Sequence, residues 1–221
     1  MAIKRRKQRS SMSDYKSQAD KITQLLEIGK THLQAGRLLE AKEIFRQILE
    51  ADANNPIALR MMGLVAFRDG QKEIALEFIN EAIAINPSNA EAHDNLGMVL
   101  LEVGHLNDAI ISFQNALIIN PNLANAHFNL GSVFQGLGHQ KKAITYLKKS
   151  LRLTPENAKA NIHEKLGYAF NALGEKKEAL KHLNKNLELN RIKNFIDPND
   201  ISIRFISKPK INHDIEQFRY L

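Results

Sequence analysis

The chain has 221 residues, 43% of them hydrophobic and 25% charged, which is the balance of a folded protein. It has no cysteine, which excludes disulfides, thiolate metal sites and cysteine nucleophiles and suits a reducing, cytoplasmic compartment. No run of 18 apolar residues occurs, so no membrane-spanning helix is expected. The net charge of +7 is uneven, because residues 1–21 hold seven Lys and Arg against two Asp, a net of +5. The remaining 200 residues carry only about +2.

The first predicted element is a basic arm, residues 1–19, which we expect to be disordered. Its cations include Lys4, Arg5, Arg6, Lys7 and Arg9. No apolar stretch follows them, so the arm does not resemble a secretory signal. It could contact the phosphates of nucleic acid, approach an anionic membrane, or only solubilise the chain. Because no aromatic residue interleaves the charges, we favour the solubilising role.

A repeat occupies residues 20–190. Small residues recur every 34 residues, with one interval of 36 before the last unit, and form three ladders in register. The ladders are Gly29, Gly63, Gly97, Gly131 and Gly167; Ala41, Ala75, Ala109, Ala143 and Ala179; and Gly36, Gly70, Gly104, Gly138 and Gly174. Such a period indicates one supersecondary unit stacked five times. The units are about 22–55, 56–89, 90–123, 124–157 and 158–191.

The sequence pattern of each unit predicts a helix, a turn and a second helix. In unit 90–123, apolar residues follow the i, i+3, i+4, i+7 spacing of a helix face up to Gly104, which is suited to end a helix. Helical spacing resumes at Ala109, and Pro121 ends the unit. Gly97 lies in the middle of the first helix, where glycine costs about 1 kcal/mol relative to alanine. We therefore expect Gly97 and Ala109 to meet at a tight helix crossing.

These residues resemble the tetratricopeptide repeat family over about residues 22–190. The large apolar position of the second helix holds Phe45, Ile79, Phe113, Leu147 and Leu183. The closing proline is present at Pro87, Pro121 and Pro155, and Ala53 and Arg191 replace it in the outer units. The resemblance implies an all-α fold, a right-handed superhelical α-solenoid of five helix–turn–helix repeats. It also implies a concave surface lined by the first helices.

The position where this family often has tryptophan holds Leu25, Leu59, His93, His127 and His163. The histidines could bind a metal or fill niches between packed helices. Helix axes lie about 8–10 Å apart, too far for one ion to be ligated from successive units. We therefore predict packing, and no metal or cofactor. Pro87–His93 and Pro121–His127 are six residues apart but Pro155–His163 eight, so two extra residues are expected in the loop around 157–162.

The predicted concave face carries the candidate binding residues. Asn95 and Asn129 occupy the same place in adjacent units, and such amides can hold the backbone of an extended peptide. The pair resembles the asparagine ladder of O-linked N-acetylglucosamine transferase arrays, although the matching places elsewhere hold Glu27, Met61 and Lys165. The other candidates are Arg60, Phe67, Asp94, Met98, Phe128 and Tyr168.

No catalytic motif occurs, so we predict a non-enzymatic, cytoplasmic scaffold or adaptor that binds a protein or peptide ligand. After the array, residues 191–221 form a tail that breaks the repeat. Its pattern predicts a strand at 201–206 and a helix at 213–221, which resembles the opening of a further domain. The alternative function is therefore the recruiting module of a longer enzyme, a sugar transferase or an iron/2-oxoglutarate oxygenase.

Overall fold

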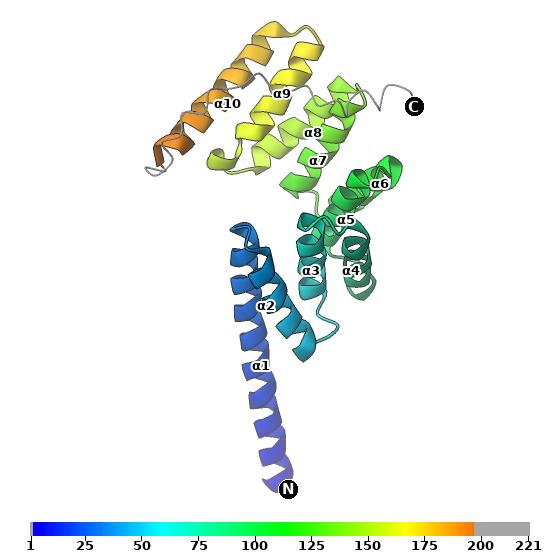
Figure 1. The fold of residues 1–221 in the computed structure, drawn as a ribbon, viewed down its shortest axis with the longest axis vertical. Helices are drawn as coiled ribbons and strands as arrows, with labels where there is room; N and C mark the ends of the chain where they lie inside the picture. The colour runs from blue at the N-terminus through cyan, green and yellow to red at the C-terminus, as the bar shows by residue number, and fades with distance from the viewer. Residues whose placement is uncertain (1, 197–221) are drawn as a thin grey trace. The chain divides into compact units, whose positions relative to one another are not determined.

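Ten α-helices and one short 3₁₀ turn make up the part of the chain that the structure describes (Figure 1). The computed structural model describes residues 2–196, with side-chain surroundings for residues 18–191. The elements are α1 (Ala2–Gln34), α2 (Leu38–Ala51), α3 (Pro56–Arg68), α4 (Lys72–Ile85), α5 (Ala90–Glu102), α6 (Leu106–Ile119), α7 (Ala124–Gly136), α8 (Gln140–Leu153), η1 (Glu156–Ala158), α9 (Ala160–Ala172) and α10 (Lys176–Ile196). The described residues contain no strand, so the all-α prediction is confirmed there.

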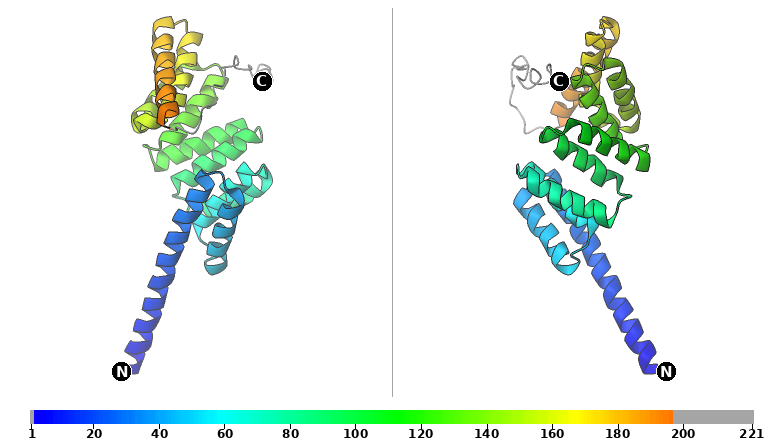
Figure 2. Two further views of the ribbon diagram at one scale, coloured as in Figure 1. Left: turned by 60° about the vertical axis from the view of Figure 1, so that its left-hand side comes forward. Right: turned by 90° about the vertical axis from the view of Figure 1, so that its right-hand side faces the viewer.

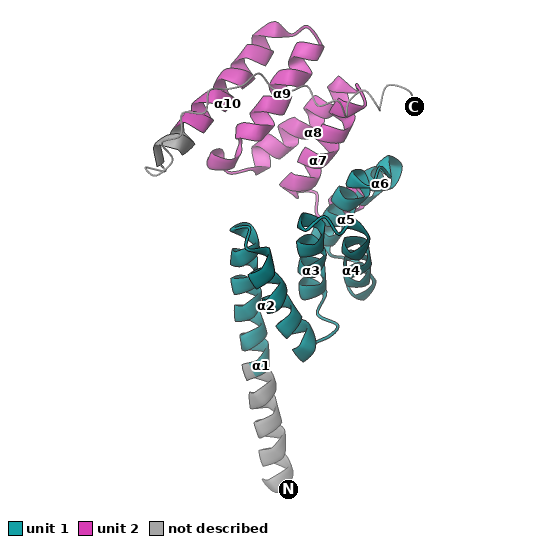
Figure 3. Ribbon diagram, in the orientation of Figure 1, with its two compact units in different colours: residues 1–112 teal, residues 113–221 magenta. Residues whose placement is uncertain are grey.

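Consecutive helices pack in pairs, as α1 with α2, α3 with α4, α7 with α8, and α9 with α10 (Figure 2). The chain forms two compact units, residues 1–112 and 113–221, and the boundary falls within α6 (Figure 3). In unit 1, α2 packs on α3 and α4 on α5. In unit 2, α8 packs on α9. The first helices of neighbouring hairpins also touch within each unit, α3 with both α1 and α5, and α7 with α9.

The third glycine ladder forms the turns inside the hairpins. All five of its glycines have φ between +74° and +87°, a conformation that a Cβ atom disfavours. At Gly70 the backbone N–H donates to Phe67 O at 3.1 Å, and the next N–H, of Gln71, donates to Ala66 O at 2.9 Å. This is the hydrogen-bond pattern of a Schellman cap. The prediction that these glycines end the first helices is confirmed.

The first glycine ladder lies at a close approach of helices, but its main neighbour differs from the one predicted. A Cβ atom on Gly63 would lie 2.6 Å from the Ile79 side chain and 3.2 Å from the carbonyl oxygen of Ala75. On Gly29 it would lie 2.6 Å from the ring of Phe45. Both glycines therefore make room first for the large residue of the second helix, and Gly63 only next for the ladder alanine. For Gly97 and Ala109 the close contact stays a prediction, and at Gly63 the ladder alanine is the second neighbour.

The large residues of the second helices fill the hairpin interiors. Phe45, Ile79, Phe113 and Leu147 are fully buried, and so are four of the five ladder alanines, with Ala179 nearly so. In unit 1, Phe45 belongs to a core cluster with Leu33 and Ile48, among others. In unit 2, Leu147 clusters with Leu166 and Phe170. Burial on this scale is the main source of hairpin stability.

Three regions outside the regular repeat can be compared with the predictions. The structure assigns residues 2–19 to α1, in place of the predicted disorder; neither proline nor glycine precedes Gly29, so nothing in the sequence interrupts a helix there. The two extra residues near 157–162 lie at the 3₁₀ turn η1, as predicted. α10 continues to Ile196, and the predicted strand and helix of the tail lie outside the described residues.

Candidate functional site

The candidate binding residues all lie on first helices of the hairpins. In unit 1, Arg60 and Phe67 belong to α3, and Asp94, Asn95 and Met98 belong to α5, which contacts α3. In unit 2, Phe128 and Asn129 belong to α7, and Tyr168 belongs to α9, which contacts α7. The candidate residues therefore fall into two groups, one in each unit, and each group has its own chemistry.

In unit 1, Arg60 and Asn95 form the centre of the candidate surface. With its amide oriented to satisfy both neighbours, Asn95 accepts a hydrogen bond from Arg60 Nη1 at 3.3 Å and donates one to Glu91 O at 3.3 Å. Asn95 is only 6% exposed, so it is not the open rung that the sequence predicts. Arg60 is half-buried, and its Nε is buried without a hydrogen-bond partner. Burial lowers the pKa of Arg60, and the nearby Glu91 opposes that effect.

The other three candidates of unit 1 are also partly or fully covered. Asp94 is buried, and Met98 is half-buried beside it on α5. Phe67 is half-buried and packs against the core cluster that includes Ile79 and Val99. Phe67 is therefore in part a core residue.

In unit 2, an aromatic ring and a lysine form the corresponding pair. Lys165 Nζ lies 5.7 Å from the centre of the Phe128 ring, a cation–π contact between α9 and α7. Burial lowers the pKa of Lys165, although Glu164 opposes the shift. Tyr168 is 46% exposed and donates a hydrogen bond to Glu164 Oε1 at 3.1 Å; burial and that carboxylate raise its pKa. Asn129 is half-buried.

Two of the three predicted packing histidines fill the same niche in successive hairpins. His93 Nε2 donates to Pro87 O at 3.0 Å, and His127 Nε2 donates to Pro121 O at 2.9 Å. In both, the acceptor is the proline six residues earlier. Burial lowers the pKa of His127, and the hydrogen bond to Pro121 opposes this. Both histidines thus pack against the turn that precedes their helix, as predicted.

His163 makes a different contact. Its Nδ1 lies 2.8 Å from Nδ1 of His182 on α10, so one imidazole donates and the other accepts. The His182 ring also stacks on Phe170, with 5.5 Å between ring centres. The two extra residues after Pro155 separate His163 from the acceptor used by His93 and His127. Sequence reasoning missed His182; the changed spacing was the available signal that His163 needed another partner.

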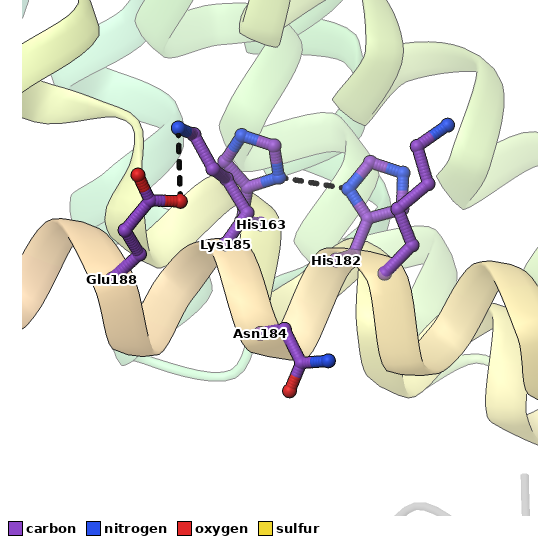
Figure 4. Close-up of a pocket in the computed structure, with 6 residues that line it drawn as sticks. His163, His182, Asn184, Lys185 and Glu188 are labelled. Atoms are coloured by element: carbon purple, nitrogen blue, oxygen red, sulfur yellow. Dashed lines mark hydrogen bonds and ion pairs between the residues drawn. The ribbon is translucent and has the colours of Figure 1, made fainter.

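A pocket of about 520 Å³ lies beside this pair (Figure 4). Besides the two imidazoles it is lined by Lys181, Asn184, Lys185 and Glu188 of α10. Lys185 Nζ lies 3.2 Å from Glu188 Oε2, so the cation is partly neutralised at the pocket. Figure 4 shows the hydrogen-bonded imidazoles at one side of the pocket and the Lys185–Glu188 ion pair at the other.

The histidine pair predicts a pH-dependent stability of unit 2. Burial lowers the pKa of both residues; Lys159 and Lys185 lower that of His163 further, and His163, Lys148 and Lys181 lower that of His182. Glu156 and Glu178 oppose these shifts. In the unfolded chain these histidines have their ordinary pKa of about 6.5, so below that pH the unfolded state binds more protons than the folded state. The free energy of unfolding therefore falls as the pH drops through that value.

We expect the free energy of unfolding to decrease between about pH 7.5 and pH 5, as measured by denaturant titration. The double variant His163→Gln and His182→Gln should decrease less over the same range. The difference between the unfolding free energies of the variant and the wild type near pH 7.5 measures the packing that the substitutions remove. An equally steep decrease in the variant would exclude the pair as the cause.

No three His, Asp or Glu side chains among the described residues come together as ligands for one metal ion. None of the described helices combines the length and the hydropathy needed to cross a membrane.

Comparisons with known proteins agree with the repeat architecture. Two family models, each described as a tetratricopeptide repeat, match residues 26–90 and 88–156. No curated protein sequence matches the chain. Solved structures do. The crystal structure of MamA is 27% identical, with a TM-score of 0.61, covering 76% of this chain and 97% of that one.

Two other solved structures support the fold alone. Pseudomonas aeruginosa pilF is 22% identical, with a TM-score of 0.70, and 78% of each chain is covered. TTC0263, a thermophilic tetratricopeptide protein of Thermus thermophilus, is 24% identical, with a TM-score of 0.67, covering 77% of this chain and 92% of that one. The resemblance to transferase arrays stays a prediction. The two family models, the turn glycines and these structures together show that the chain belongs to the tetratricopeptide repeat family.

Proposed function

We propose that this chain is a protein-interaction scaffold that binds an extended peptide segment on the surface formed by its first helices. Membership of the tetratricopeptide repeat family supports a protein as the binding partner. The finer proposal concerns the ligand, which we infer to carry a carboxylate, either an acidic side chain or a chain end. The observation that carries it is the half-buried Arg60 with an unpartnered Nε.

The chemistry of Arg60 supports a carboxylate ligand. Its guanidinium presents donors in a fixed fork that matches a carboxylate, and Asn95 occupies only Nη1. A buried donor without a partner costs about 1–3 kcal/mol, which a movement of the side chain that brings Nε to a ligand carboxylate would recover on binding. In this proposal Asn95 holds the Arg60 guanidinium in place. The sequence instead predicts that Asn95 contacts the peptide backbone directly.

The candidate surface of unit 2 adds aromatic contacts to this proposal. Phe128 is half-buried beneath Lys165, and Tyr168 is 46% exposed to solvent. Aromatic anchors often dominate peptide interfaces. Asn129, half-buried on α7, remains a candidate for the peptide backbone.

Peptides selected from a random displayed library against the full chain would test the proposal. We expect the selected sequences to share an acidic residue or a free carboxyl end. Fluorescence anisotropy should show that Arg60→Gln weakens the tightest peptide about tenfold or more, because a charge-assisted hydrogen bond is lost. Arg60→Lys should recover only part of the affinity, since a lysine lacks the fork. Asn95→Ala with Asn129→Ala should also weaken binding.

Arg46→Gln on α2 is the matched control. Arg46 is exposed and paired with Glu43 and Glu50, away from the candidate surface, so its loss should leave affinity unchanged. Thermal melts of every variant separate lost binding from lost folding. Equal affinity for wild type and Arg60→Gln would remove Arg60 from the site and with it the carboxylate ligand.

A further inference from the structure

The near-neutral charge of the array conceals a strong asymmetry between its two units. Residues 18–112 of unit 1 hold eight Lys and Arg against 14 Asp and Glu, a net charge of −6. Residues 113–191 of unit 2 hold 12 Lys and Arg against five Asp and Glu, a net of +7. Outside residues 1–17 of the basic arm, the part of the chain in unit 1 is therefore acidic and the part in unit 2 is basic.

In unit 1, part of the negative charge forms a stripe on α4. Glu73, Glu77 and Glu81 follow one another at intervals of four residues, so they share one face of the helix. All three are exposed. Among the described residues none of these carboxylates forms an ion pair, in contrast to Glu43 and Glu50 of α2, which pair with Arg46. The α4 stripe is therefore an exposed and unneutralised acidic surface.

In unit 2, the same places on the repeat are basic. Two repeats later, or 68 residues along, Lys141 and Lys149 stand where α4 has Glu73 and Glu81. The cations of α8 are Lys141, Lys142, Lys148, Lys149 and Arg152, and the helix contains no acidic residue. Within the described part of the chain, no carboxylate pairs with any of them. Buried residues of α8, Ala143 and Leu147 among them, lie on the opposite side of the helix.

From this complementarity we propose that the chain associates with itself, the acidic α4 stripe of one copy docking on the basic α8 stripe of a second copy. A second copy supplies both charged surfaces, and these match in sign and in repeat register. A single exposed ion pair contributes little, but several opposed charges on two helices form a network and also steer encounter. The contact is heterologous, because it joins two different surfaces, and it leaves the first-helix surface open for the peptide.

Sedimentation equilibrium of the full chain at about 20 mM and about 300 mM NaCl tests the proposal, because salt screens exposed charges. We expect an average mass well above 25.0 kDa at low salt and a shift toward 25.0 kDa at high salt. A wild-type chain that remains at 25.0 kDa at low salt, at a concentration on the order of 100 μM, overturns the proposal.

Charge reversal identifies the two surfaces. The α4 variant combines Glu73→Lys, Glu77→Lys and Glu81→Lys, and the α8 variant combines Lys141→Glu, Lys149→Glu and Arg152→Glu. Each alone should associate at least about tenfold more weakly than wild type, because like charges then face each other. An equimolar mixture of the two variants should recover association, since each supplies the surface that the other now complements.

Three controls keep the result specific. Reversing Lys176, Lys177 and Lys181 on α10 changes the net charge by the same amount and should leave association intact. If that variant associates as weakly as the α8 variant, net charge alone is responsible and the proposal fails. It also fails if nuclease treatment abolishes association, since nucleic acid then bridges the basic surfaces, or if the mixed variants stay monomeric. Melts at high salt verify that every variant is folded.

Discussion

Replacing Phe45 with alanine is expected to lower the free energy of unfolding by about 3–5 kcal/mol. Phe45 is fully buried in the core cluster of unit 1, and its ring fills the space left by Gly29, where a Cβ atom would be only 2.6 Å away. Removing the ring leaves a cavity between α1 and α2 that a glycine cannot fill. Denaturant titration of the full chain measures the loss.

Leu39→Ala is the matched control for Phe45→Ala. Leu39 lies on the same helix but is 82% exposed, so its truncation should change the unfolding free energy by less than about 0.5 kcal/mol. A loss below about 1 kcal/mol for Phe45→Ala would mean that the hairpin collapses around the missing ring. The hairpin interior would then be less tightly packed than the contact with Gly29 indicates.

The hairpins themselves were predictable because their signals are local. A glycine such as Gly70 ends a helix through its own backbone conformation, and Pro87 ends the next through its missing N–H, so neither depends on distant residues. The close approach at the first ladder was also predictable. Its main neighbour was not, because spacing places Ala75 and Ile79 on the same helix without saying which side chain reaches Gly63 first.

The candidate site was less predictable, because burial and pairing depend on tertiary contacts. Asn95 shares its repeat position with Asn129, yet it is buried against Arg60, a residue 35 positions earlier. His163 differs from His93 only by two inserted residues nearby, and its partner His182 comes from the following helix. The repeat pattern predicts where such residues lie on a helix, and the neighbouring helices decide what they contact.

Gly131 gives the sharpest test of why the glycine ladder is kept, because two effects of opposite sign compete there. Alanine in place of a mid-helix glycine should gain about 1 kcal/mol of helix propensity. Its Cβ, however, would lie 2.7 Å from Leu147 Cγ and 3.2 Å from the Leu147 backbone nitrogen, and the backbone atom cannot move aside cheaply. We expect the clash to prevail, so that Gly131→Ala destabilises the chain and Gly131→Leu destabilises it further, by about 1–3 kcal/mol.

A second substitution should reverse the sign. Leu147→Ala alone should cost about 2–5 kcal/mol, but in that background Gly131→Ala gains space and should stabilise, which a double-mutant cycle measures as coupling. Gly136→Ala is the control on the same helix, since no atom lies within 4 Å of the added Cβ and only the propensity gain remains. If Gly131→Ala stabilises the wild-type chain as much as Gly136→Ala does, the close approach of α7 and α8 is not what requires glycine. The ladder would then need an explanation other than packing.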